Sequence, residues 1–177
     1  VTDAGFSAYY AGDSASLSGF ADGAKLSAKF KAPTGFCVDS TNLIYIADQQ
    51  NHAIRRITSG GVVETPFSPA PPATPTAGSF SDSMTGKLSL FNLPYPLVFG
   101  PHSKVLWVAD SGNQMIRRLA ISTDGNSASP AKYGGNGIGF ADGGISSSKF
   151  SSPRGLAFVV NVVFVADMLN NAIRKVD

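Results

Sequence analysis

Apolar residues gather in three short runs that each end in Ala-Asp, and the same polar pattern follows each run. The copies are IYIADQQNHAIRRI, LWVADSGNQMIRRL and VFVADMLNNAIRKV, at residues 44–57, 106–119 and 163–176. The shared polar residues are Asp48, Asp110 and Asp167, with Asn51, Asn113 and Asn170 three positions later. A fixed period of about 60 residues is the signature of a repeat architecture.

Each copy predicts a small set of strands. The run before Ala-Asp is apolar on both faces, which is typical of a strand that is covered on both sides. Another strand precedes it (residues 35–39, 96–100 and 155–160), and the Ile-Arg run after it predicts a third. A fourth, weaker strand begins at Val62 in the first copy, where the proline-rich sequence that follows suits only an outer edge or a loop. We also predict a weak aromatic strand in FSAYYAG, residues 6–12.

A second repeated string precedes each set of strands. GFADG occurs at 19–23 and 139–143, and SFSDS occurs at 79–83. A Phe follows each string at a similar interval, and a Pro follows that Phe by three residues (Phe30 and Pro33, Phe91 and Pro94, Phe150 and Pro153). Four strands per repeat, with an outermost strand that tolerates proline, is typical of a β-propeller blade.

Composition narrows the class of protein. The 177 residues are 43% hydrophobic and 15% charged, with 19 Gly, which indicates a globular β-rich chain. The net charge of +2 is too small to indicate nucleic-acid binding by itself. The single cysteine, Cys37, is predicted to be a buried structural thiol, and no apolar run is long enough to span a bilayer. The absence of an initiator Met and of a signal peptide fits a mature product or an excised fragment, and no location is predicted.

The repeated pattern resembles the NHL repeat. The residues that carry the resemblance are Phe-x-x-Pro-x-Gly, then the apolar run with Ala-Asp, then Asn and Ile-Arg, and Asn51-His52 matches the Asn-His of the family name. The resemblance covers nearly the whole chain and implies a propeller, mostly six-bladed in that family. Copy two departs from it at Pro96, where the others have Gly35 and Gly155, so this position is not required to be left-handed.

We therefore predict an all-β fold with three four-stranded blades, one single domain over residues 1–177. The blade repeats are placed at about 13–75, 76–133 and 134–177, with 1–12 as a closing outer strand. Three blades would leave large apolar faces open at both ends. We expect two chains to join head to tail into a six-bladed ring, each N-terminal strand completing the partner's last blade. Half of a longer propeller and an open three-blade solenoid are the alternatives.

The repeated polar residues are predicted to be structural. An Asp at a strand end accepts backbone N–H bonds, and its occurrence in every copy favours that role over a ring of carboxylates around a cation. The first basic residue of each pair (Arg55, Arg117, Arg174) is expected to bond to the Asp or to turn carbonyls of its own blade. The second of each pair (Arg56, Arg118, Lys175) points the opposite way along the strand.

The residues around the turn between Asp and the third strand distinguish the copies and are the predicted partner-binding positions. Variable turns on a rigid scaffold are where binding residues concentrate. Met168 and Leu169 are apolar there, which favours a protein or peptide partner over a sugar or phosphate. The predicted set is Gln49, Gln50, His52, Ser111, Gln114, Met168 and Leu169.

Two other functions stay open. An RNA-binding propeller would use Arg56, Arg118 and Lys175 as a basic face, although aromatic residues for base stacking are not interleaved with them. A channel-centred lyase or hydrolase is the third reading. The two histidines, His52 and His102, fall in turns on opposite faces of a propeller, and no catalytic motif is present. We predict no enzyme activity, no metal and no cofactor.

Overall fold

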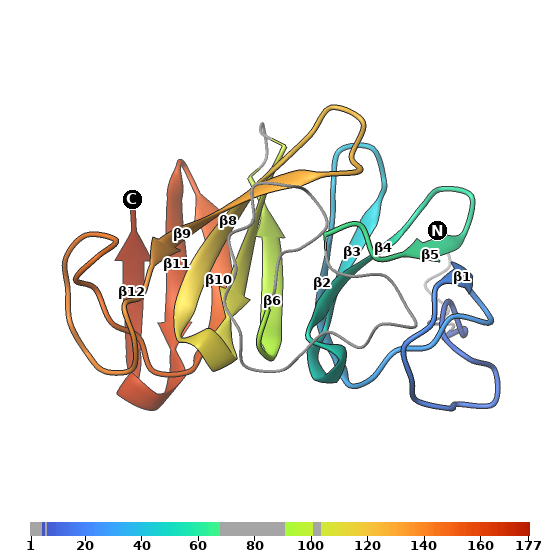
Figure 1. Ribbon diagram of the computed structural model, residues 1–177, viewed down its shortest axis with the longest axis horizontal. Helices are drawn as coiled ribbons and strands as arrows, with labels where there is room; N and C mark the ends of the chain where they lie inside the picture. Colours follow the sequence, from blue (N-terminus) through green and yellow to red (C-terminus); the bar gives the residue numbers. More distant parts are fainter. Residues whose placement is uncertain (1–4, 6, 68–90, 101–103) are drawn as a thin grey trace.

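The computed structural model describes residues 5, 7–67, 91–100 and 104–177, and in these ranges the chain is all-β. Antiparallel sheets and three short 3-10 turns account for its regular structure, with no α-helix among the described residues. Figure 1 shows the sheets side by side along the long axis, from β12 at one end to β1 and β5 at the other. Among the described residues, no helix is long and apolar enough to cross a membrane.

The first sheet has the strand order β1-β5-β4-β3-β2. Its strands are β2 (Pro33–Val38), β3 (Ile44–Asp48), β4 (Ala53–Ile57), β5 (Val62–Glu64) and the short β1 (Gly23–Ala24), with the turn η1 (Gln49–Asn51) between β3 and β4. The predicted strand at 35–39, the strand formed by the apolar run before Ala-Asp, and the Ile-Arg strand are thereby confirmed to within two residues.

The second sheet has the order β6-β7-β8-β9, and the third has the order β10-β11-β12. The strands are β6 (Pro94–Phe99), β7 (Val105–Asp110), β8 (Met115–Ile121), β9 (Ala128–Gly134), β10 (Pro153–Val159), β11 (Val162–Asp167) and β12 (Ala172–Val176), with η2 (Ser111–Asn113) and η3 (Met168–Asn170). The three sheets therefore repeat one strand–strand–turn–strand unit, as the sequence predicts, and β6 lies next to both β2 and β10.

The strand counts differ from a uniform four. The first sheet has five strands because Gly23 and Ala24 pair with Val63 and Val62 of β5. No strand pairs with the outer edge of β12 among the described residues. The predicted strand at 6–12 is also not formed by the described residues 7–12. A strand needs a partner edge, and the edge predicted for this segment belongs to the last blade of a second chain.

Two apolar layers hold the sheets together. One layer lies between the first and second sheets and includes Tyr45, Ile54, Leu106 and Val108. The other lies between the second and third sheets, where the Trp107 ring stands edge-on to Tyr133 with centroids 4.5 Å apart. All six residues of β7 are buried because its sheet is covered on both faces, which confirms the prediction from its apolar run.

The structure gives the roles of Gly35 and Cys37, both in β2. Gly35 lies where β2 approaches the second sheet: a Cβ on Gly35 would lie 3.1 Å from Cα of Pro96. Neither Gly35 nor Gly155 has a positive φ, so this glycine serves close approach, and proline is accommodated in copy two. Cys37 lies in β2 against the first apolar layer, where burial raises its thiol pKa to about 12.

Candidate functional site

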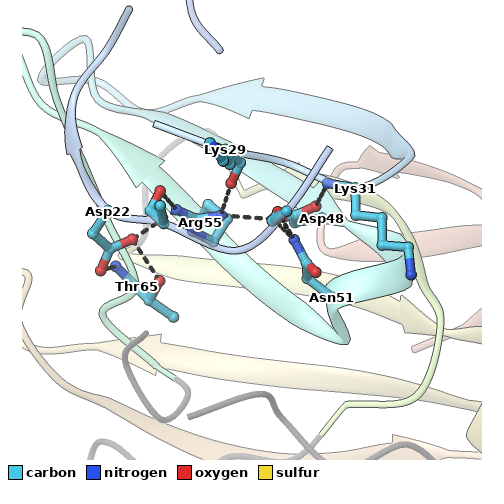
Figure 2. Close-up of polar contacts among 9 residues, drawn as sticks. Asp22, Lys29, Lys31, Asp48, Asn51, Arg55 and Thr65 are labelled. Carbon is cyan, nitrogen blue, oxygen red and sulfur yellow. Dashed lines mark hydrogen bonds and ion pairs between the residues drawn. The ribbon is translucent and has the colours of Figure 1, made fainter. Parts of the chain in front are cut away.

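The repeated Asp is the centre of a buried network in each sheet, and Figure 2 shows the network of the first sheet. In the first sheet, Asp48 Oδ1 accepts the Lys31 N–H at 2.7 Å, and Oδ2 accepts Asn51 Nδ2 at 2.8 Å and Arg55 Nη1 at 2.7 Å. Both charged side chains of the Asp48–Arg55 pair are fully buried. The network ties β3, η1 and β4 to the chain that leads into β2.

The other two sheets repeat the network. Their Asp residues accept a backbone N–H from Asn92 and Ser151, an amide from Asn113 and Asn170, and an arginine Nη1 at 3.4 and 3.1 Å, in Asp110–Arg117 and Asp167–Arg174 respectively. The sequence predicts that the first Arg bonds to the Asp or to turn carbonyls of its own repeat, and the bond to the Asp is present in all three.

The arginine also holds the repeated Phe-Ala-Asp string. Arg55 Nη2 donates to the Ala21 carbonyl and to Asp22 Oδ1, both at 2.7 Å, and its guanidinium lies 4.9 Å from the Phe20 ring centroid and 5.0 Å from that of Phe30. Arg174 makes the same contacts with Ala141, Asp142, Phe140 and Phe150. The sequence shows both motifs but does not show that they contact each other. That each occurs three times is the sequence feature that could have linked them.

The three Asp carboxyls have no exposed surface, and burial raises the pKa of Asp110 to about 6. Their oxygens are occupied by hydrogen bonds inside each sheet, so no substrate reaches them. Among the described residues, no group of three or more His, Cys, Asp or Glu side chains is placed to hold a metal ion; His102 lies outside those residues. The Asp–Asn–Arg network is therefore structural, and a binding site for a partner would lie on other residues.

The turn residues His52, Ser111 and Gln114 contact the next sheet. His52 Nδ1 accepts the Leu93 N–H at 3.1 Å, and Gln114 Oε1 accepts the Ser152 N–H at 2.6 Å. Ser111 Oγ donates to the Pro153 carbonyl. The structure therefore brings these three predicted partner-binding residues to the junctions between sheets.

His52 makes the first junction sensitive to pH. Its Nδ1 must be unprotonated to accept the Leu93 N–H, and burial, with a smaller contribution from the Lys31 charge, lowers its pKa below 6.5. The unfolded chain then binds the proton more tightly, so the free energy of unfolding falls as pH drops below about 6.5. We expect His52→Gln, which keeps an acceptor as at Gln114, to flatten this fall in urea denaturation curves. Parallel curves for the two proteins would contradict it, because His102 is common to both.

The other predicted partner-binding residues remain accessible. Gln49 is half-buried and Gln50 is exposed, while Met168 and Leu169 are 38% and 61% exposed. Figure 1 shows η1, η2 and η3 on the same edge of the molecule. Met168 occupies the position of Ser111, so its exposure results from the open end of the third sheet.

The second basic residues do not form one exposed surface. Arg56 is 5% exposed, pairs with Glu64 at 2.6 Å, and reaches Asn126 Oδ1 at 3.0 Å in the β8–β9 turn of the second sheet. Arg118 is half-buried, and Lys175 is exposed beside Asp177. Arg56 does point away from Arg55, but that direction is towards the second sheet.

The third sheet exposes an apolar face whose equivalent is covered in each of the other two sheets. Ile173 is 74% exposed, whereas Ile54 and Ile116, at the same position of the other copies, are 0% exposed. Phe164 is 39% exposed, against 1% for Tyr45 and 5% for Trp107. We call Phe164, Ala166 and Ile173 the C-terminal open face.

At the other end of the molecule, the first sheet also exposes an apolar face, the one that points away from the second sheet. Phe36 is 72% exposed, while Leu97, at its position in the second copy, is 5% exposed. Phe36, Ile44 and Ile46 line a hollow of ≈ 800 Å³ together with Tyr10, Phe30 and Ile57. We call Phe36, Val38, Ile44 and Ile46 the N-terminal open face. The C-terminal open face is equivalent to one side of each internal sheet–sheet contact, and the N-terminal open face is equivalent to the other side.

Comparison with known families and proteins agrees with this geometry. The model of the NHL repeat matches residues 30–57, which span the first sheet from Phe30 to the end of β4. NHL repeat-containing protein 2 of Bos taurus is 35% identical over 98 residues, 55% of this chain and 13% of that protein. Protein SUPPRESSOR OF QUENCHING 1, chloroplastic, of Arabidopsis thaliana is 28% identical over 165 residues, 90% of this chain and 15% of that protein.

Solved structures share the fold at low sequence identity. An auxiliary nutrient binding protein from Bacteroides ovatus has a TM-score of 0.65 at 17% identity, over 86% of this chain and 39% of that one. A putative phosphatase from Bacteroides thetaiotaomicron has a TM-score of 0.65 at 16% identity, over 86% and 36%. The chain thus spans well under half the length of the proteins it matches, and these structures support the fold alone.

Proposed function

We propose that this chain, whose residues 30–57 match the NHL repeat, is a non-catalytic protein-binding module whose open sheet faces bind further blades of the same kind. The observation that carries the proposal is Ile173, 74% exposed where Ile54 and Ile116 are fully buried. A side chain that is core in two copies is core-forming in the third once a sheet covers it, and burying a large apolar side chain contributes about 1.5–3 kcal/mol.

A second copy of the chain is the proposed occupant. Its N-terminal open face offers Phe36, Ile44 and Ile46 at the positions that the second and third sheets use to cover their neighbours. Two chains joined head to tail at both ends would form a closed ring of six blades, a size within the usual four to eight.

The chain ends support the same arrangement. Tyr9 and Tyr10 are 56% and 54% exposed in the segment predicted as a strand, and the outer edge of β12 lacks a strand partner among the described residues. A sheet edge with free N–H and C=O groups accepts an added strand. The N-terminal segment of one copy would therefore complete the third sheet of the other.

Partners other than the chain itself would bind at the turn edge. Gln50 and Leu169 are exposed there, and the three turns are carried on rigid sheets, which suits a protein or peptide ligand. The RNA alternative is less well supported because Arg56 is buried and paired. Lyase or hydrolase activity remains the third alternative, and the three repeated Asp side chains are held in structural bonds.

The test is the mass in solution, measured by light scattering on a sizing column over a range of concentrations. The chain weighs 18.3 kDa, and the expected species has about twice that mass at every concentration above its dissociation constant. A closed ring stops at two chains, whereas an open head-to-tail array keeps growing with concentration. A monomer throughout the range would contradict the proposed self-association.

A further inference from the structure

The two internal junctions share one polar contact. In each junction, the residue after the 3-10 turn accepts a backbone N–H from the residue just before the first strand of the next sheet. His52 accepts the N–H of Leu93, before β6, and Gln114 accepts that of Ser152, before β10. The donors and acceptors come from different sheets, so the contact fixes how far one sheet slides along the other.

Both residues of this contact have a left-handed backbone conformation. The acceptor residues have left-handed φ values of 52° and 58°, and the donors Leu93 and Ser152 have 46° and 54°. Non-glycine residues seldom adopt this conformation, so its occurrence on both sides of each junction marks a defined geometry.

Each end of the chain carries one half of the same contact. Asn171 follows η3 with φ 52°, and Ala32 precedes β2 with φ 49°. In the described part of the chain, neither the Asn171 side chain nor the Ala32 N–H has a hydrogen-bond partner. Asn Oδ1 is separated from Cα by the same number of bonds as His Nδ1, so Asn171 can present an acceptor where His52 does. Asn also tolerates the left-handed conformation.

We propose that Asn171 sets the register of self-association by accepting the Ala32 N–H of a second copy of this chain. This rests on the self-association proposed above and specifies its geometry. A head-to-tail dimer then contains the contact twice, once at each junction between chains.

A second contact fits the same register. Arg56 reaches from β4 to the β8–β9 turn of the next sheet, where it bonds to the Gly125 carbonyl and Asn126 Oδ1. Lys175 has the equivalent place in β12 and lies exposed beside the C-terminal open face. In the second copy, the β4–β5 turn at residues 58–61 would present its carbonyl groups to this ammonium.

The test compares the dimer dissociation constants of the wild type, Asn171→Gly and Asn171→His, measured by sedimentation equilibrium. Gly keeps the left-handed backbone and removes the acceptor, and we expect weakening of up to about tenfold per junction, or up to about a hundredfold for the ring. Asn171→His copies the first junction and should dimerise as tightly as the wild type. Equal dissociation constants for the wild type and Asn171→Gly would overturn the proposal, as would weakening by His equal to that by Gly.

Amide hydrogen exchange gives an independent readout. In the wild type, the Ala32 amide should exchange more slowly in the dimer than in the dilute monomer, and this protection should be lost in Asn171→Gly dimers. An unprotected Ala32 amide in a wild-type dimer overturns the register alone. A wild type that is monomeric throughout overturns the self-association, and the register with it.

Discussion

Ile173→Glu abolishes self-association and leaves the three sheets folded: this is the expected result at the C-terminal open face. Ile173 is 74% exposed in the single chain, so a charge there costs the monomer little. In the proposed ring it is buried as Ile54 and Ile116 are, and an unpaired carboxylate in such a place costs about 3 kcal/mol or more. The dimer dissociation constant should rise by at least about a hundredfold, measured by light scattering.

Leu17→Glu is the matched control for this prediction. Leu17 is also a large exposed apolar side chain, at 56%, but it belongs to neither sheet face. It should leave the dimer unchanged. Equal effects of the two substitutions, or a dimer of Ile173→Glu as tight as that of the wild type, would show that the C-terminal open face is not the interface.

Asp48→Ala should be the most destabilising single change in the first sheet. It removes the buried carboxylate partner of the Arg55 guanidinium, which keeps only the partly exposed Asp22, and it removes the acceptor of the Lys31 N–H and the Asn51 amide. Breaking a buried ion pair from one side costs about 3–5 kcal/mol. We expect that loss in the free energy of unfolding, measured by urea denaturation.

Two further variants separate burial from pairing. Asp142 also pairs with an arginine, Arg174, but its side chain is 83% exposed, so Asp142→Ala should cost about 1 kcal/mol or less. The double variant Asp48→Leu with Arg55→Met removes both buried charges and should recover part of the loss. If Asp48→Ala costs no more than Asp142→Ala, the buried network is not what stabilises the sheet.

The repeat made most of the fold predictable. Its apolar runs located the strands because alternation and burial on both faces leave a sequence signature, as in β7. The pairing of Gly23 and Ala24 with β5 was not predictable, since two small residues carry no strand signal. The strand predicted at 6–12 has a sound pattern, but strand pairing depends on which edge is available, and a single chain's sequence does not state that.

The junction residues were harder to assign. His52 and Gln114 differ between copies, which favours a binding role when only the sequence is considered. What they share is an acceptor atom on a residue in the left-handed conformation, and this appears only in three dimensions. Similarly, alternation gave the correct direction for Arg56, opposite to Arg55. The side of a blade that looks exposed in one repeat is covered by the next repeat, so Arg56 is buried.

The placement of Trp107 has a practical consequence. It is the single tryptophan of the chain, and it is 5% exposed between the second and third sheets, in contact with Tyr133 and Phe158. Its ring therefore belongs to an internal junction and to neither open face. Its fluorescence emission is an intrinsic signal for separation of those two sheets that is silent to the joining of two chains. Fluorescence can thus report unfolding, and light scattering can report dissociation, in the same unlabelled sample.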